Sequence, residues 1–441
     1  MKHLRWCALA VLFATALVFP AMANMVPQRT VLDNGLVLLT SQQRALPMVS
    51  IELLIEAGSR FELANQAGLA NLTAKLLTYG TRRRSATEIS EALDFIGASL
   101  TTGGGKDVAS VSLTLLKKDL VTGLELLAEI LTESIFPQEE IDRQKQAVIA
   151  AIRAREEDPG AVAETTFAAA LFPKSPYGRP VEGTEPSVKS LERKSLQEFF
   201  AQHYLPNRAI MSVVGDVAEQ EIAKALNQAL KGWTQGAQST QPSVPAVIGA
   251  PQWVRINKDL TQSNIVLGHQ GVARGNPDYY AIQVMNYILG GGGFSSRAMD
   301  SIRNERGLAY SVYCYFSAEK SHGTFQFVMQ TKNETALEAI RIAKEEIRRI
   351  REQPVSEQEL RDAKDYLIGS FPLRLDTNRK VASFLAQVEY YQLGLDYPER
   401  YADLIGKVSR EDVQRVAKQY LHPEKLITVV VGNLQRLGAT P

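Results

Sequence analysis

Histidine and cysteine, two side chains that often bind zinc, are few and scattered in this sequence. Beyond the amino-terminal segment the histidines are His203, His269, His322 and His422, and no two of them stand four residues apart. A zinc site needs three or four converging ligands, and two ligands on one helical face are normally separated by four residues. We therefore expect His203 and His422 to lie at helix ends without a metal, and Cys314 to be a small buried hydrophobe.

One segment of the chain predicts a helix with a characteristic start and end, and two further short motifs lie before and after it in the sequence. The segment 68–81 begins Gly-Leu-Ala, ends Gly-Thr and carries leucines along one stripe, which predicts a helix over residues 66–78. Residues 57–62 (Ala-Gly-Ser-Arg-Phe-Glu) precede it, and residues 176–184 (Pro-Tyr-Gly-Arg-Pro-Val-Glu-Gly-Thr) follow it. Together, and over essentially the whole chain after residue 23, these motifs resemble the pitrilysin/insulinase family of zinc peptidases, which includes the mitochondrial processing peptidase.

The resemblance implies a metal site at positions of this chain that hold no metal ligand. The family's helix carries H-x-x-E-H where this chain has Asn71, Ala74 and Lys75, and its third ligand, a Glu, falls at Ala151. In the family the two His bind zinc and the Glu between them activates a water. Asn is a poor zinc ligand, Ala has nothing to donate, and the Lys75 ammonium would repel a dication by several kcal/mol at short range. We expect no metal cofactor in this chain.

The resemblance continues in the second half with a glycine-rich segment, residues 289–297, followed by Arg303 and Tyr310. In the family such a pair reaches across a chamber to the substrate near the zinc of the facing domain. An arginine offers forked donors to a peptide carbonyl, and a tyrosine hydroxyl can stabilise charge developing on it. The alternatives are that the glycines only end a helix, that Arg303 forms a surface salt bridge and that Tyr310 is a core residue. The absence of Lys-Ser/Thr after the glycines argues against a phosphate-binding loop.

The elements that must position these residues occur twice. Three pairs of residues share one offset of 217 positions: Pro137 and Pro354, Pro206 and Pro423, and Gly215 and Gly432. The first pair precedes acidic helix starts, and the other two flank β-branched strands that follow a helix. Three agreements at one offset indicate a duplicated module.

Strands and helices are mixed without regular alternation, which favours an α+β fold. Residues 29–32 and 36–40 predict a hairpin around Asn34-Gly35, and residues 138–157 predict a long helix. We expect two homologous mixed α/β-sandwich domains of clamshell type. They span residues 24–236, with the degenerate metal site, and 252–441, joined by a Gln-, Ser-, Gly- and Pro-rich linker at 237–251.

Residues 1–23 predict a cleaved signal peptide, with Lys2 and Arg5 before a short apolar run and a small-x-small cleavage site at its end. The run is too short for a stable membrane anchor, so we expect a periplasmic or secreted protein. Without this segment, 47 Lys and Arg face 48 Asp and Glu, a balance that argues against a nucleic-acid partner. Only Cys314 then remains, which excludes an internal disulfide.

Three functions are compatible with these residues. The first is a subunit, not catalytic alone, of an exported heteromeric zinc metallopeptidase. Its H-x-x-E-H-bearing sister chain would supply the zinc, and Arg303 and Tyr310 would bind the substrate, a peptide or unfolded protein added as a strand to a sheet edge. The second is a peptide-binding or structural scaffold of the same fold that acts without hydrolysis. The third, an autonomous peptidase with an unrelated site, has no ligand cluster in its support.

Overall fold

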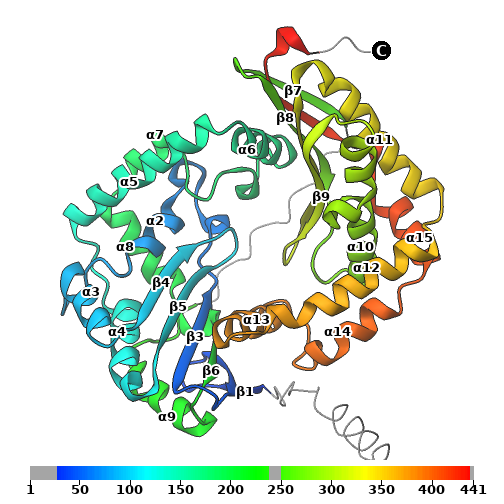
Figure 1. The fold of residues 1–441 in the computed structure, drawn as a ribbon. Helices are drawn as coiled ribbons and strands as arrows, with labels where there is room; N and C mark the ends of the chain where they lie inside the picture. The colour runs from blue at the N-terminus through cyan, green and yellow to red at the C-terminus, as the bar shows by residue number, and fades with distance from the viewer. Residues whose placement is uncertain (1–26, 238–249, 438–441) are drawn as a thin grey trace, which may run out of the picture.

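The computed structural model describes residues 27–237 and 250–437, and each half of the chain builds one mixed sheet covered by helices (Figure 1). The predicted signal peptide, residues 1–23, lies outside the described residues, as does most of the predicted linker. Within the described ranges, none of the helices combines the length and hydrophobicity that a membrane crossing requires. The limits assigned to the two domains stay a prediction.

Six strands form the first sheet in the order β1-β2-β6-β3-β5-β4. They are β1 (Gln28–Val31), β2 (Val37–Gln42), β3 (Met48–Ile55), β4 (Ser99–Gly104), β5 (Ala109–Leu116) and β6 (Ala209–Gly215). The helices of this half are α2 (Leu69–Leu76), α3 (Ala86–Phe95), α4 (Leu120–Thr132), α5 (Gln138–Glu157), α6 (Pro159–Leu171), α7 (Glu185–Ser190), α8 (Arg193–His203) and α9 (Glu219–Ala229). β1 and β2 pair antiparallel around Asn34-Gly35, which confirms the predicted hairpin.

Five strands form the second sheet in the order β7-β11-β8-β10-β9. They are β7 (Gln252–Asn257), β8 (Gln262–Gln270), β9 (Ala309–Ala318), β10 (Gly323–Lys332) and β11 (Ile427–Gly432). The helices of this half are α10 (Tyr279–Asn286), α11 (Ala336–Glu352), α12 (Glu357–Ser370), α13 (Asn378–Tyr390), α14 (Tyr397–Gly406) and α15 (Arg410–Tyr420).

The two sheets share one topology once β1 is set aside. In each sheet one parallel pair, β2 with β6 or β7 with β11, is followed by three antiparallel neighbours. β6 and β11 end at Gly215 and Gly432, the glycines that the 217-residue offset relates. The repeat that the prolines and glycines indicate is therefore a repeat of strand order and direction.

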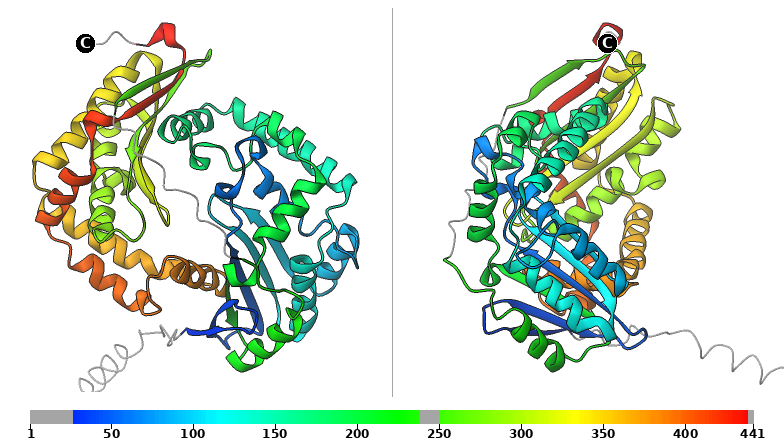
Figure 2. Two further views of the ribbon diagram at one scale, coloured as in Figure 1. Left: turned by 180° about the vertical axis from the view of Figure 1, so that it is seen from behind. Right: turned by 90° about the vertical axis from the view of Figure 1, so that its left-hand side faces the viewer.

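Each half lends one helix to the sheet of the other half, as Figures 1 and 2 show. α6 packs on β8 and β11, where Phe167 lies so close over Gly268 that a Cβ there would stand 2.6 Å from the ring. α13 packs on β3 and β6, with Leu385 buried beside Leu39 and Val214. Because both contacts are buried and apolar, the exchange fastens the halves to one another.

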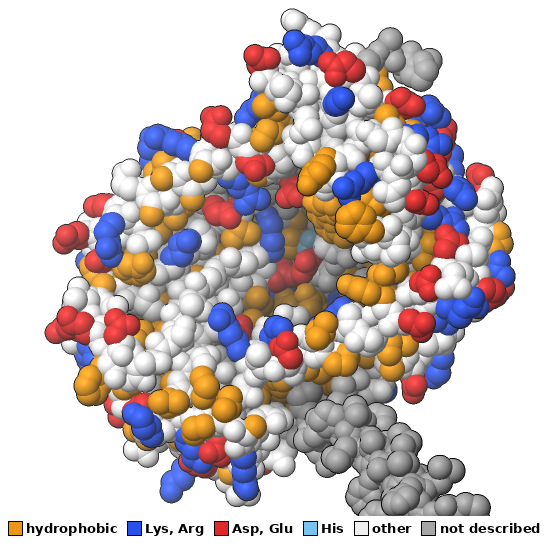
Figure 3. Space-filling view, in the orientation of Figure 1, with side chains coloured by type: hydrophobic (Ala, Val, Ile, Leu, Met, Phe, Trp, Pro, Cys, Tyr) orange, Lys and Arg blue, Asp and Glu red, His pale blue; other side chains and the backbone are white. Residues whose placement is uncertain are grey.

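Polar contacts also join the halves at the β9–β10 turn. Lys320 Nζ lies 3.1 Å from Glu56 Oε1. The ring of His322 packs on the ring of Tyr177, with 3.7 Å between centroids, and the Tyr177 hydroxyl donates to Asp107 over 2.7 Å. Burial lowers the pKa of His322 to about 4, so its ring is neutral near pH 7. Figure 3 shows the surface hollowed between the two halves.

Candidate functional site

The helix that resembles the metal-binding helix is α2, and its key positions differ in environment. Asn71 and Ala74 are buried, whereas Lys75 is exposed. The edge strand β4 passes directly over Asn71, because a Cβ on Gly104 would stand 2.7 Å from the Asn71 Cα. The predicted helix over residues 66–78 is too long at both ends, because α2 spans Leu69–Leu76. Gly68 takes a left-handed φ of 96°, so that α2 begins at Leu69.

The two motifs that flank α2 in the sequence hold its amino-terminal end in place. Glu62 accepts hydrogen bonds from the backbone N–H of Gly68 (3.2 Å) and of Ala70 (2.7 Å). Arg179 donates to the Glu62 carbonyl oxygen over 3.1 Å. Gly183 approaches the same turn so closely that a Cβ there would lie 2.3 Å from the Ala67 carbonyl oxygen. The motifs around α2 therefore have a structural role that does not depend on a metal.

Burial alters the acidity of the groups around this end of α2. Burial raises the pKa of Glu62 to about 7, although the two backbone hydrogen bonds and the charges of Arg179 and Lys106 act in the opposite direction. Burial also lowers the pKa of Lys106 to about 8, and its ammonium donates to the Arg179 carbonyl oxygen. The carboxyl that caps α2 therefore changes its charge near neutral pH.

Ala151, the fourth position of the degenerate site, lies exposed on α5 at the wall of a cavity of about 310 Å³. Ile152, Val162 and Thr165 line the same cavity, and its Glu182 pairs with Arg155 over 3.2 Å. Residues 27–237 and 250–437 contain no group of three or more His, Cys, Asp or Glu that could hold a metal ion. The side chains at the degenerate site do not fit zinc.

In the second half, the side chains of Arg303 and Tyr310 lie together. Arg303 belongs to the π-helix Met299–Asn304, and Tyr310 follows on β9. The Arg303 guanidinium carbon is 5.4 Å from the centroid of the Tyr310 ring and 5.0 Å from that of Phe294, which we call the Phe294–Arg303–Tyr310 cluster. Tyr310 is 76% exposed, so it is not a core residue. Arg303 forms no ion pair with any described residue.

Phe294 is the member of this cluster that the sequence does not single out, although an aromatic residue after four glycines is a visible signal. Its side chain is 73% exposed. The glycines before it serve two purposes. A Cβ on Gly290 would stand 2.9 Å from the Cys314 backbone nitrogen, so Gly290 lets the π-helix Tyr287–Gly291 pack on β9. Gly293, with a φ of 58° and open space around it, forms the turn that presents Phe294.

The two halves thus repeat one fold, and helix α2 of the first half carries no metal ligand at positions 71, 74 and 75. Residues 37–185 match the pattern of the insulinase family (peptidase family M16), and residues 190–367 match the pattern of the peptidase M16 inactive domain. The chain therefore belongs to the M16 peptidase family, as a member that lacks the H-x-x-E-H ligands.

Individual relatives agree with this assignment. An uncharacterized zinc protease of Streptomyces coelicolor is 28% identical over 412 residues, which are 91% of this chain and 89% of that protein. A protein of Helicobacter pylori named non-peptidase homolog YmxG is 28% identical over 396 residues, which are 90% of this chain and 91% of that protein. The structure of a peptidase M16 inactive domain from Pseudomonas fluorescens superimposes with a TM-score of 0.87 at 27% identity, covering 92% of this chain and 98% of that one.

Proposed function

We propose that this chain is the non-catalytic subunit of an exported, two-chain zinc peptidase. A sister chain that carries H-x-x-E-H holds the zinc and the general base. This chain contributes Arg303 and Tyr310, which bind the substrate peptide near the zinc of the sister chain. The proposed substrate is an extended peptide or an unfolded protein segment that adds as a strand to a sheet edge.

The observation that carries the proposal is the Phe294–Arg303–Tyr310 cluster. The Arg303 guanidinium lies beside two exposed rings and has no ion-pair partner among the described residues. Its one side-chain hydrogen bond is a weak contact of 3.9 Å with Met299 Sδ, so most of its forked donors are available for a peptide carbonyl. Exposed Tyr310 presents a hydroxyl that can donate to an oxygen on which charge develops. A protein that served only as a structural scaffold would have no use for this arrangement.

The test is to measure peptide cleavage by the purified chain alone and after mixing with its H-x-x-E-H-bearing sister chain. Alone, the chain should bind no stoichiometric zinc and cleave no unstructured peptide. The mixture should cleave, and Tyr310→Phe should lower kcat by about 100-fold, as the loss of one such donor does elsewhere. Arg303→Ala should lower kcat/KM by about tenfold or more, because a charged hydrogen bond is lost.

Two exposed residues on the helices of the same half provide matched controls. Arg341→Ala on α11 and Tyr366→Phe on α12 make the same chemical changes at residues outside the cluster and should leave turnover unchanged. The Tyr366 ring packs on Tyr287 with 4.9 Å between centroids, and phenylalanine keeps that ring contact. Metal-dependent cleavage by this chain alone that survives Arg303→Ala would overturn the proposal. Equal turnover of the mixture with and without the Arg303 and Tyr310 changes would refute the shared site.

The second candidate is a non-hydrolytic peptide-binding or structural scaffold. It is favoured by the relative that bears the name non-peptidase homolog. On this alternative the chain binds unstructured peptides in the absence of any sister chain, and mixing with one produces no cleavage. Fluorescence anisotropy with a labelled unstructured peptide separates the two functions.

A further inference from the structure

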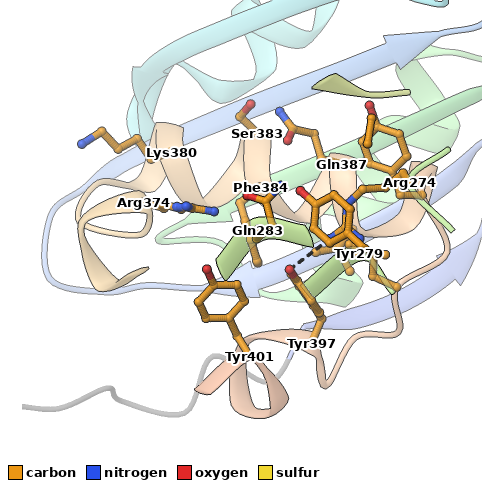
Figure 4. A pocket seen from close by; sticks show the side chains of 14 residues that line it. Arg274, Tyr279, Gln283, Arg374, Lys380, Ser383, Phe384, Gln387, Tyr397 and Tyr401 are labelled. Atoms are coloured by element: carbon orange, nitrogen blue, oxygen red, sulfur yellow. Dashed lines mark hydrogen bonds between the residues drawn. The ribbon is translucent and has the colours of Figure 1, made fainter. Parts of the chain in front are cut away.

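A second feature lies away from both the degenerate helix and the Phe294–Arg303–Tyr310 cluster. Between α10, α13 and α14 there is a cavity of about 480 Å³, within the size range of small-molecule sites. Figure 4 shows the 14 residues that line it. Three of these are cationic, Arg274, Arg374 and Lys380, and none is an Asp or a Glu.

Arg274 is the most unusual of the three cations, because its side chain is buried without a carboxylate partner. It is 9% exposed and forms no ion pair with any residue in the described ranges. Its guanidinium stacks on the Tyr279 ring, 3.7 Å from the centroid, and donates a hydrogen bond to the Tyr397 hydroxyl over 3.0 Å. It also interacts with Tyr280, whose ring centroid is 5.8 Å away. Buried arginines are normally paired with an acid, and the five N–H donors of this one are only partly used.

Arg374 and Lys380 line the same cavity, but only Lys380 has an acidic partner. Lys380 Nζ is 2.8 Å from Asp376, so its charge is largely compensated. The Lys380 side chain also extends away from the tyrosines in Figure 4. The Arg374 guanidinium carbon lies 5.8 Å from the ring centroids of Phe371 and Tyr401, and Arg374 forms no ion pair with any described residue. Two guanidinium groups therefore remain to attract an anion into the cavity.

The acids that adjoin the lining residues Ala318 and Tyr397 in the sequence are already engaged. The Glu319 carboxylate, behind the cavity wall, accepts from the Tyr391 hydroxyl over 3.3 Å. Asp396 pairs with Arg400 at 2.6 Å. Neither acid forms an ion pair with Arg274 or Arg374. The charge of the cavity is thus positive.

We propose that this cavity binds an oxyanion, the carboxylate or the phosphate of a small organic molecule. The anion accepts forked hydrogen bonds from Arg274 and Arg374, and the rings of Tyr279, Phe384 and Tyr401 contact the apolar part of the molecule. This site is independent of the proposed peptidase function. Its ligand lies against the face of α13 opposite to the one that packs on β3 and β6.

The experiment is a calorimetric titration of the full chain at low ionic strength with three probes: inorganic phosphate, N-acetyltyrosine and N-acetyltyrosine amide. The expected result is binding of one phosphate, or of one N-acetyltyrosine but not of its amide. The first outcome identifies a phosphate as the ligand group, and the second identifies a carboxylate on an aromatic molecule. Arg374→Gln should weaken the binding by about tenfold or more, because one charge-assisted contact is lost.

Arg361→Gln is the matched control, since it removes the same charge from an exposed position on α12 outside the cavity. It should leave the affinity unchanged. Arg274→Gln should abolish binding, and if that variant does not fold, the exposed Arg374 still decides the question. The proposal is overturned if neither anion binds at about 10 mM, or if Arg374→Gln and Arg361→Gln bind equally well.

Discussion

Glu62 is a single carboxyl on which burial and hydrogen bonding act in opposite directions. It caps α2 with two backbone hydrogen bonds that favour the charged form, yet its burial outweighs them and raises its pKa to about 7. In the unfolded chain the same group would titrate near 4.5. Between these two values the folded protein retains a proton that the unfolded chain has released.

The pH dependence of stability should therefore carry the signature of Glu62. As pH rises from about 4.5 to 7, the free energy of unfolding of the wild type should fall relative to Glu62→Gln by an amount on the order of 3 kcal/mol. Above pH 7 the difference should stay constant. Denaturant unfolding at several pH values measures it. The same change at Glu198, exposed on α8, should keep the wild-type profile, and parallel profiles for wild type and Glu62→Gln would contradict the assignment.

At the scale of residues, the sequence predicts those parts of the site that have a fixed spacing. Arg303 and Tyr310 are seven positions apart, on a helix and the following strand, and the structure places them together. Arg274, Arg374 and Tyr397 are separated by up to 123 positions, and no local pattern indicates that they meet. Their convergence depends on how α10, α13 and α14 pack, which is a property of the tertiary structure.

At the scale of elements, α6 and α13 should contribute strongly to the free energy of unfolding, because each covers the sheet of the other half. Phe167 of α6 is 1% exposed and fills the space above Gly268 on the sheet of the other half. Phe167→Ala should lower the free energy of unfolding by about 3–5 kcal/mol, because it leaves a cavity at a buried contact.

Val121→Ala on α4 is the control for this substitution. Val121 is exposed, and its truncation should change the free energy by no more than about 0.5 kcal/mol. Chemical denaturation measures both variants. A loss below about 1 kcal/mol for Phe167→Ala would show that α6 does not hold the second sheet.

The sequence predicts where a helix begins and ends better than it predicts which sheet that helix packs on. α5 spans Gln138–Glu157 as predicted, because Pro137 and the acidic residues after it mark a helix start. The apolar residues of α6 are equally visible, but an apolar face does not specify which sheet it covers. The exchange between halves is a contact across more than a hundred residues and has no signal in local periodicity.

At the scale of the whole molecule, the exchange predicts that the two halves unfold together. Each sheet uses a helix of the other half to cover one face, so loss of either half exposes apolar strands of both. Thermal unfolding followed by circular dichroism and by tryptophan fluorescence should give one coincident transition. Residues 24–236 and 252–441 expressed as separate chains should be poorly soluble alone and should recover stability when expressed together. Two separate transitions, or halves that fold independently, would contradict this coupling.

The same exchanged helices bear on how such a chain could arise. A module encoded once would leave one face of its sheet bare, and it could cover that face only by trading its helix with a second copy of itself. An ancestor of one module would thus be a symmetric dimer whose assembly depended on concentration. Fusion of two copies would turn that association into a contact within one chain, at a fixed effective concentration. Once joined, the copies could diverge independently, so that a first copy without metal ligands can coexist with a second copy that presents Arg303.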